Sequence, residues 1–147
     1  MLKFYNRVDE KNCECRISMC SIGSGIQMEL DSERPDGVPE QATILLTPMD
    51  AAYVSGYIGR GDDCSAGHSR TGETLDIYYR SFTKEADHKK GLSDIEFVGD
   101  MWSGWIVAGP VKMAVPDFVL LAIKNAIDAM MPSLMYASTG DMEEEFG

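Results

Sequence analysis

Apolar and polar residues alternate through much of the first third of the chain, which is typical of β-strands with one buried face. Residues 13–22 (CECRISMCSI) and 26–30 (IQMEL) both show this alternation. The turn-forming residues 23–25 (GSG) separate the two runs, so together they predict a hairpin. After a polar loop at 31–39, the short apolar run at 42–46 predicts a further strand.

Two later segments predict helices. The shorter one begins at Pro48, with Thr47 placed to cap it and Asp50 in its first turn, and Gly59 is a plausible end. The longer one covers 116–131, and Pro132 is expected to end it. Its apolar residues recur at offsets of three and four and predict a face that covers a sheet. These residues are Leu120, Ile123, Ile127, Met130 and Leu134.

Between the two helices, alternation and turn residues predict strands at 74–82, 95–98, 104–108 and 111–115, after a loop at 60–72. The order is therefore strands, short helix, strands, long helix. Strand runs followed by helices indicate an α+β fold with antiparallel sheets. We expect a single domain over residues 1–136.

The last residues, 137–147, form a polar, acidic segment with too few apolar groups to fold alone. We expect a mobile tail, which either solubilises the chain or binds a partner. Its candidate partner-binding residues are Asp141, Glu143, Glu144, Glu145 and Phe146.

The formal net charge is −11, and without the four tail carboxylates it is −11 + 4 = −7. This charge argues against broad, non-specific binding of nucleic acid but allows a local basic groove. The sequence has no apolar run long enough to span a bilayer and begins without a signal-peptide pattern. We therefore expect a cytoplasmic protein that does not bind membranes, in the host cytoplasm if a phage encodes it.

Catalytic motifs are missing from the sequence. It contains no phosphate-binding glycine loop with a lysine and no nucleophile elbow, so we expect neither an enzyme nor a cofactor. Zinc binding is the alternative for the cysteines, but their spacing fits no common zinc module, so we expect free thiols and no metal. The set concerned is Cys13, Cys15, Cys20, Cys64 and His68.

Aromatic and cationic residues gather in the second half of the chain. Single-stranded DNA is bound by aromatic rings that stack on bases and by cations that follow the phosphates. Aromatic residues in strands are more often core, which is the competing interpretation. The candidate DNA-binding residues there are Tyr78, Arg80, Phe82, Lys84, Lys89, Lys90, Trp102 and Trp105.

Four segments resemble the Whirly family of single-stranded DNA-binding proteins: 45–52 (LLTPMDAA), 104–107 (GWIV), 111–121 (VKMAVPDFVLL) and 126–135 (AIDAMMPSLM). The resemblance implies two four-stranded sheets, each followed by a helix, as in the eukaryotic single-stranded DNA-binding coactivators. It also implies a homo-oligomer. The family's basic second-strand motif would fall within residues 13–30, where Arg16 is the one cation, and Arg16 joins the candidate DNA contacts.

The tail is similar to those of bacterial and phage single-stranded DNA-binding proteins, which engage partner enzymes. We therefore expect a non-enzymatic single-stranded DNA-binding protein whose tail recruits replication or recombination proteins. The alternative is an acidic protein-interaction module, such as a phage inhibitor or DNA mimic, and a zinc-binding protein ranks below both.

Overall fold

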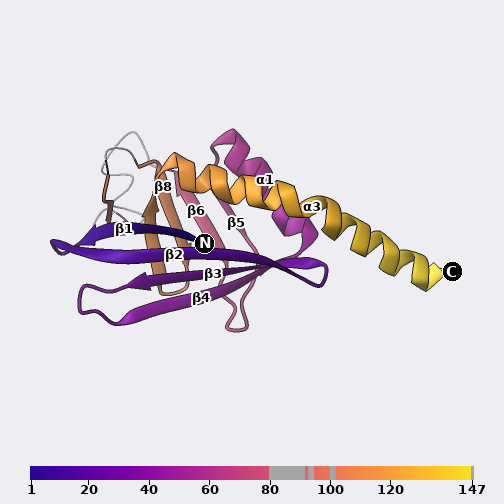
Figure 1. Cartoon of the computed structure of the whole chain (residues 1–147), viewed down its shortest axis with the longest axis horizontal. Coiled ribbons are helices and arrows are strands. Elements are labelled where there is room, and N and C mark those ends of the chain that lie inside the picture. Colours follow the sequence, from indigo (N-terminus) through magenta and orange to yellow (C-terminus); the bar gives the residue numbers. More distant parts are fainter. Residues whose placement is uncertain (80–91, 93–94, 100–101, 147) are drawn as a thin grey trace.

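In the computed structural model, two antiparallel sheets pack face to face, and two helices lie along one side of them (Figure 1). The structure describes residues 1–79, 92, 95–99 and 102–146. The α+β class with antiparallel sheets, predicted from the order of elements, is confirmed.

The first sheet has the strand order β4-β3-β2-β1-β7. Its first four strands are consecutive in the chain, and the short β7 pairs with the free edge of β1. The predicted hairpin over 13–30 is confirmed as β2 and β3. A strand at the N-terminus was not predicted. The bounds are β1 Leu2–Val8, β2 Lys11–Ile22, β3 Gly25–Glu33, β4 Pro39–Leu46 and β7 Glu96–Phe97.

The second sheet has the strand order β5-β6-β8-β9. Strands β8 and β9 have the bounds that the sequence predicts, and β6 begins one residue later than predicted, while positions 80–82 of the predicted strand lie outside the described residues. The expected loop at 60–72 is wrong in one part, because residues 64–66 pair with β6 as a strand. The bounds are β5 Cys64–Ala66, β6 Leu75–Tyr79, β8 Gly104–Ala108 and β9 Val111–Val115.

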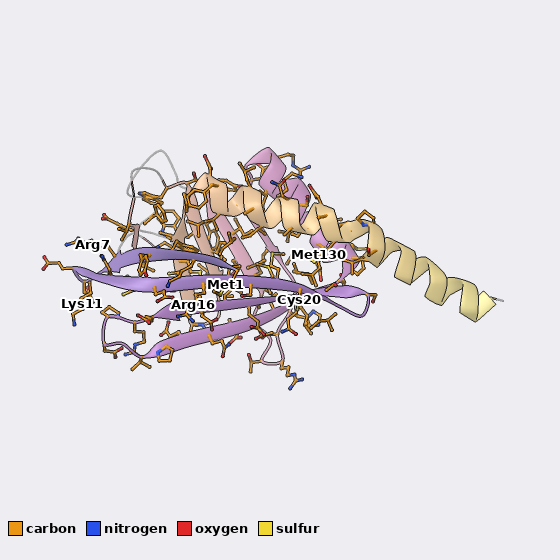
Figure 2. The ribbon with its side chains drawn as sticks, in the orientation of Figure 1. Met1, Arg7, Lys11, Arg16, Cys20 and Met130 are labelled. Carbon is orange, nitrogen blue, oxygen red and sulfur yellow. The ribbon has the colours of Figure 1, made fainter. Side chains whose placement is uncertain are left out.

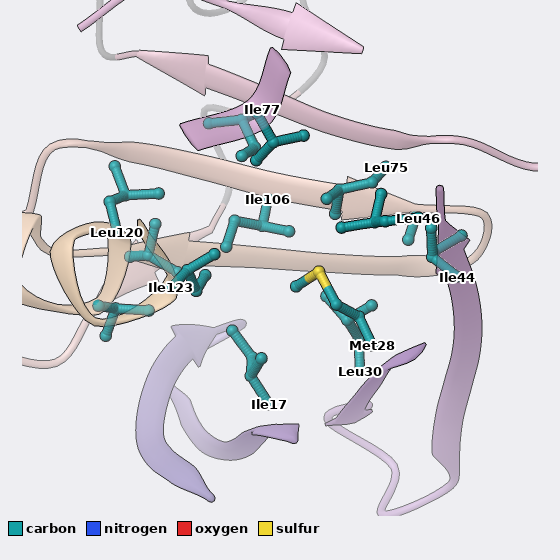
Figure 3. Close-up of a cluster of buried hydrophobic side chains, with 14 of the residues drawn as sticks. Ile17, Met28, Leu30, Ile44, Leu46, Leu75, Ile77, Ile106, Leu120 and Ile123 are labelled. Atoms are coloured by element: carbon teal, nitrogen blue, oxygen red, sulfur yellow. The ribbon is translucent and has the colours of Figure 1, made fainter. Parts of the chain in front are cut away.

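The main core lies between the two sheets and beneath the helices. The inward side chains of both sheets meet there, with Met28 and Leu30 facing Leu75 and Ile106 across the layer (Figure 3). Ile123, from the long helix, closes one end of the same cluster. Burial of these alternating aliphatic positions is the main favourable contribution to folding.

Helix α1 spans Pro48–Arg60 and begins as predicted. The Thr47 hydroxyl accepts a hydrogen bond from the Asp50 amide, and the Asp50 carboxylate accepts one from the Thr47 amide. This capping box satisfies two amides that the first turn leaves unpaired. The helix continues past Gly59 to Arg60 and is capped by Gly61, which adopts the left-handed conformation with φ of 73°.

Helix α3 spans Asp117–Phe146, so the expectation that Pro132 ends it is wrong. Proline lacks the amide for one hydrogen bond of the helix, and here the helix continues without that bond. The predicted apolar stripe is confirmed, since Leu120, Ile123, Ile127 and Leu134 are buried. Beyond Leu134 the helix runs away from the sheets (Figure 1). The mobility expected for 137–147 stays a prediction.

The outer face of the second sheet carries a smaller cluster of buried side chains. Trp105 and Ala114 on this face are covered by Leu92 and by Ile95, Phe97 and Trp102, which come from the connection between β6 and β8. This sheet is therefore packed on both faces, whereas the outer face of the first sheet is open to solvent over β1 and β2.

No helix in the described part of the chain is long and apolar enough to cross a membrane.

Candidate nucleic-acid interface

Strand β1 presents a cation–aromatic–cation row on the outer face of the first sheet. Lys3, Tyr5 and Arg7 are exposed, while Phe4 and Asn6 between them are buried. Alternate residues of a strand share a face, so the three exposed side chains lie in a line. The Tyr5 side chain is 42% exposed, so its ring is accessible from solvent.

Asn6 fixes which face of β1 points outward. Its side-chain amide donates to the Ala114 carbonyl oxygen at 2.8 Å, and its carbonyl oxygen accepts from the Ala114 amide at 2.9 Å. The residue is 1% exposed, so both bonds lie in the interior. Rotating β1 to hide Tyr5 would break both bonds and leave buried polar groups unpaired.

Glu14 lies directly across from Tyr5 in the β1–β2 register. The Arg16 Nε donates to Glu14 Oε1 at 2.6 Å, and Lys3 Nζ lies 3.4 Å from the same oxygen. The hydrogen bond from Arg16, together with that from Lys3, lowers the pKa of the Glu14 carboxyl. The same bond raises the pKa of the Arg16 guanidinium. The Glu14 carboxylate, paired with Lys3 and Arg16, therefore lies directly beside the row.

Charge changes sign between the first and second halves of the segment that forms the first four strands. Residues 1–22 hold four cations and three carboxylates, a net charge of 4 − 3 = +1, whereas residues 25–46 hold one cation and five carboxylates, a net charge of 1 − 5 = −4. Arg7, Lys11 and Arg16 lie on β1 and β2 (Figure 2). An anionic backbone would therefore follow β1 and β2 and avoid β3.

A hollow of about 330 Å³ opens where these two charge regions meet. Its volume is within the range of small-ligand pockets, roughly 300–1,000 Å³. The hollow borders the Glu14–Arg16 ion pair. It is lined by Glu14, Arg16, Asp31, Ser32, Glu33 and Pro39.

Three of the predicted aromatic contacts come together on the second sheet. Tyr78 is opposite Trp105 in the β6–β8 register, and the rings of Trp102 and Trp105 lie edge to face, 4.6 Å apart. Trp105 is 0% exposed, so its expected role in base stacking is wrong: the chain's own side chains already cover the ring. Tyr78 and Trp102 are half-buried in the same cluster.

Several predicted contacts lie outside what the structure describes. The segment with most of the predicted cations is outside the described residues, and it contains Arg80, Phe82, Lys84, Lys89 and Lys90. The last turns of α3 contain the predicted tail residues Asp141, Glu143, Glu144, Glu145 and Phe146. Arg16 is thus the predicted contact that the structure places on the exposed cationic face.

The thiols are dispersed. Cys13 and Cys15 point into the core from β2, Cys64 is buried on β5, and Cys20 is exposed on β2. Burial raises the pKa of the Cys15 thiol to about 12 and that of Cys64 to about 11. No group of three or more His, Cys, Asp or Glu among the described residues is arranged to hold a metal ion.

One polar cluster joins the helices. Lys124 Nζ donates to Ser55 Oγ at 3.1 Å and to Asp128 Oδ2 at 2.7 Å, and Ser55 Oγ donates to Asp128 Oδ1 at 2.5 Å. A Ser–Lys pair can act as nucleophile and base. Here, however, Lys124 is a hydrogen-bond donor to both partners, and Ser55 is 6% exposed between α1 and α3. The cluster connects two helices.

Sequence reasoning missed Lys3, Tyr5 and Arg7. The alternation that identifies strands is present in residues 2–8, but the buried position 6 is an asparagine rather than an apolar residue. The pattern therefore breaks at the residue whose hydrogen bonds hold the strand in place. The usable signal was the spacing of a cation, an aromatic residue and a cation at every second position.

Comparison of the chain with protein-family models, with curated proteins and with solved structures found no match.

Proposed function

We propose that the protein binds single-stranded nucleic acid, DNA by preference, without an enzymatic activity of its own. The observation that carries this proposal is the row of Lys3, Tyr5 and Arg7 on the open outer face of the first sheet, with Arg16 beside it. Proteins bind single strands through exposed aromatic rings between cations, with a base stacked on the ring and phosphates paired with the cations.

Fold-level analogy adds support. Helix α1 follows the first four strands and α3 follows β9, which is the order expected for a Whirly-like protein, although β7 adds a fifth strand to the first sheet where the resemblance implies four. On this proposal the protein forms a homo-oligomer in the cytoplasm, so that several sheet faces share one strand. The acidic end of α3 would recruit replication or recombination proteins, because its carboxylates suit basic surfaces on such partners.

Tyr5→Ala tests the stacking role. We expect the affinity for labelled oligo-dT to fall by about 1–3 kcal/mol, the usual cost of removing a stacked ring. Tyr5→Phe keeps the ring and should bind as the wild type does. Fluorescence anisotropy at low salt measures both. Equal affinity of Tyr5→Ala and wild type would rule out stacking on this ring.

A second candidate function, an acidic protein-interaction module or DNA mimic, is favoured by the other half of the same face. Glu29, Asp31 and Glu33 follow one another on β3 with the spacing of one strand face. If the wild-type protein fails to bind an oligonucleotide at micromolar concentration and low salt, nucleic-acid binding is excluded in favour of this alternative.

A further inference from the structure

We infer that the cationic row distinguishes bases, and that Glu14 makes it prefer guanine. This inference rests on the proposed binding of single strands. A platform made only of rings and cations accepts every base, because each base has a face to stack and each nucleotide a phosphate. The outer face of β1 and β2 differs from such a platform by the carboxylate fixed directly across from Tyr5.

The two oxygens of Glu14 are in different positions. Arg16 and Lys3 both interact with Oε1, at 2.6 and 3.4 Å, so both ion pairs meet at one oxygen of the carboxylate. These ion pairs favour one orientation of the Glu14 side chain before a ligand arrives. The side chain of Glu14 is 17% exposed, at the border of the hollow.

Guanine is the base whose Watson–Crick edge matches this arrangement. It presents two adjacent donors, N1–H and the N2 amino group, next to the acceptor O6. A carboxylate accepts from both donors, and the neighbouring Arg16 on β2 donates to O6. Thymine offers a single N–H between two carbonyl oxygens, which a carboxylate repels. Adenine and cytosine each place one amino group beside an acceptor nitrogen.

Charge also fixes which way a nucleotide would lie. Phosphates are drawn to Lys3 and Arg7 on β1, while Asp31 and Glu33 around the hollow repel them. A nucleotide stacked on Tyr5 would therefore keep its backbone over β1 and direct the edge of its base toward β2. Glu14 is on that side, so the base edge and the carboxylate meet.

The test compares three oligonucleotides of equal length, made of TTG, TTI or TTT repeats, where I is inosine. Hypoxanthine, the base of inosine, keeps N1–H and O6 but lacks the N2 amino group. Full-length protein should bind the TTG oligonucleotide roughly tenfold more tightly than the TTT one, with TTI between them, which is the discrimination expected of one bidentate base contact. Anisotropy competition measures all three.

Glu14→Gln should bring the three affinities within roughly twofold, because an amide in that place offers a donor toward the guanine donors. The TTT affinity of this variant should not fall, which also shows that it is folded. Glu29→Gln is the matched control: it removes the same charge from the same face, on β3, and should keep the preference for TTG.

Equal binding of TTG and TTI by the wild type overturns the inference and leaves the proposed function intact. A preference that persists in Glu14→Gln overturns the assignment to Glu14. Failure to bind all three oligonucleotides overturns both the inference and the proposed function.

Discussion

The Asn6 side chain joins two backbone groups of Ala114 in the interior, and it gives a prediction at the scale of one residue. Asn6→Ala removes both hydrogen bonds and leaves the Ala114 amide and carbonyl buried without their partner. We expect a loss of about 1–3 kcal/mol in the free energy of unfolding for each group left unpaired. Urea denaturation of both proteins measures the loss. A change below about 0.5 kcal/mol, typical of surface substitutions, would contradict it.

The cysteines provide a second prediction at this scale. Cys20 is exposed, whereas Cys13, Cys15 and Cys64 are buried, and burial raises the pKa of Cys15 and Cys64 to about 12 and about 11. The thiolate is the reactive form, so at neutral pH one thiol per chain should react rapidly with a disulfide reagent. The other three should react only after denaturation. Rapid reaction of two or more thiols in the folded protein would contradict this.

At the scale of elements, the polar cluster between α1 and α3 makes stability depend on pH. The hydrogen bonds from Lys124 and Ser55 hold the pKa of Asp128 below its ordinary value of 3.8. A depressed carboxyl pKa stabilises the fold fully above the unfolded value, and this contribution is lost as pH falls through the folded value. Asp128→Asn should therefore be less stable than wild type at neutral pH, and the difference should shrink at pH below 3.8.

Urea denaturation of both proteins across this range tests the linkage. A difference between Asp128→Asn and wild type that stays constant down to low pH would contradict the assignment.

Local chemistry explains which elements the sequence predicted. The β2–β3 hairpin, β8, β9 and the start of α1 are coded by alternation, turn glycines and a capping pair, which act over a few residues. Strand β1 was missed because its central buried residue is polar and its partner, Ala114, is distant in the sequence. The helix continues beyond Pro132, so the prediction that this proline ends the helix was wrong.

The candidate site was predicted in part for the same reason. Arg16 could be found because it is the one cation within residues 13–30, but Tyr5 and Glu14 become neighbours only through the β1–β2 register. Trp105 was misassigned because residues that cover its ring come from a different segment, including Leu92. Sequence patterns identify which face of a strand is apolar, and they do not say what covers it.

At the scale of the whole molecule, the net charge is −11, and we expect the carboxylates of the acidic end to compete with nucleic-acid phosphates for the protein's few cations. Deleting residues 140–147 removes four carboxylates, so affinity for single-stranded DNA should stay equal or rise. The free energy of unfolding should change by less than about 0.5 kcal/mol, because the deletion begins beyond Leu134, a buried residue of the α3 stripe. Anisotropy and urea denaturation measure the two quantities. Weaker binding by the truncated protein would show that the segment contributes to the interface.

The long reach between Asn6 and Ala114 has a consequence for how the chain folds. The two residues are 108 positions apart, and contacts of such separation slow folding because a large loop must close first. On a ribosome that adds about 5–20 residues per second, Asn6 waits roughly 5–20 s before its partner is even synthesised. Strands β1 to β4 can pair in that time, but the Asn6 hydrogen bonds that hold β1 against the second sheet form only after β9 has been synthesised.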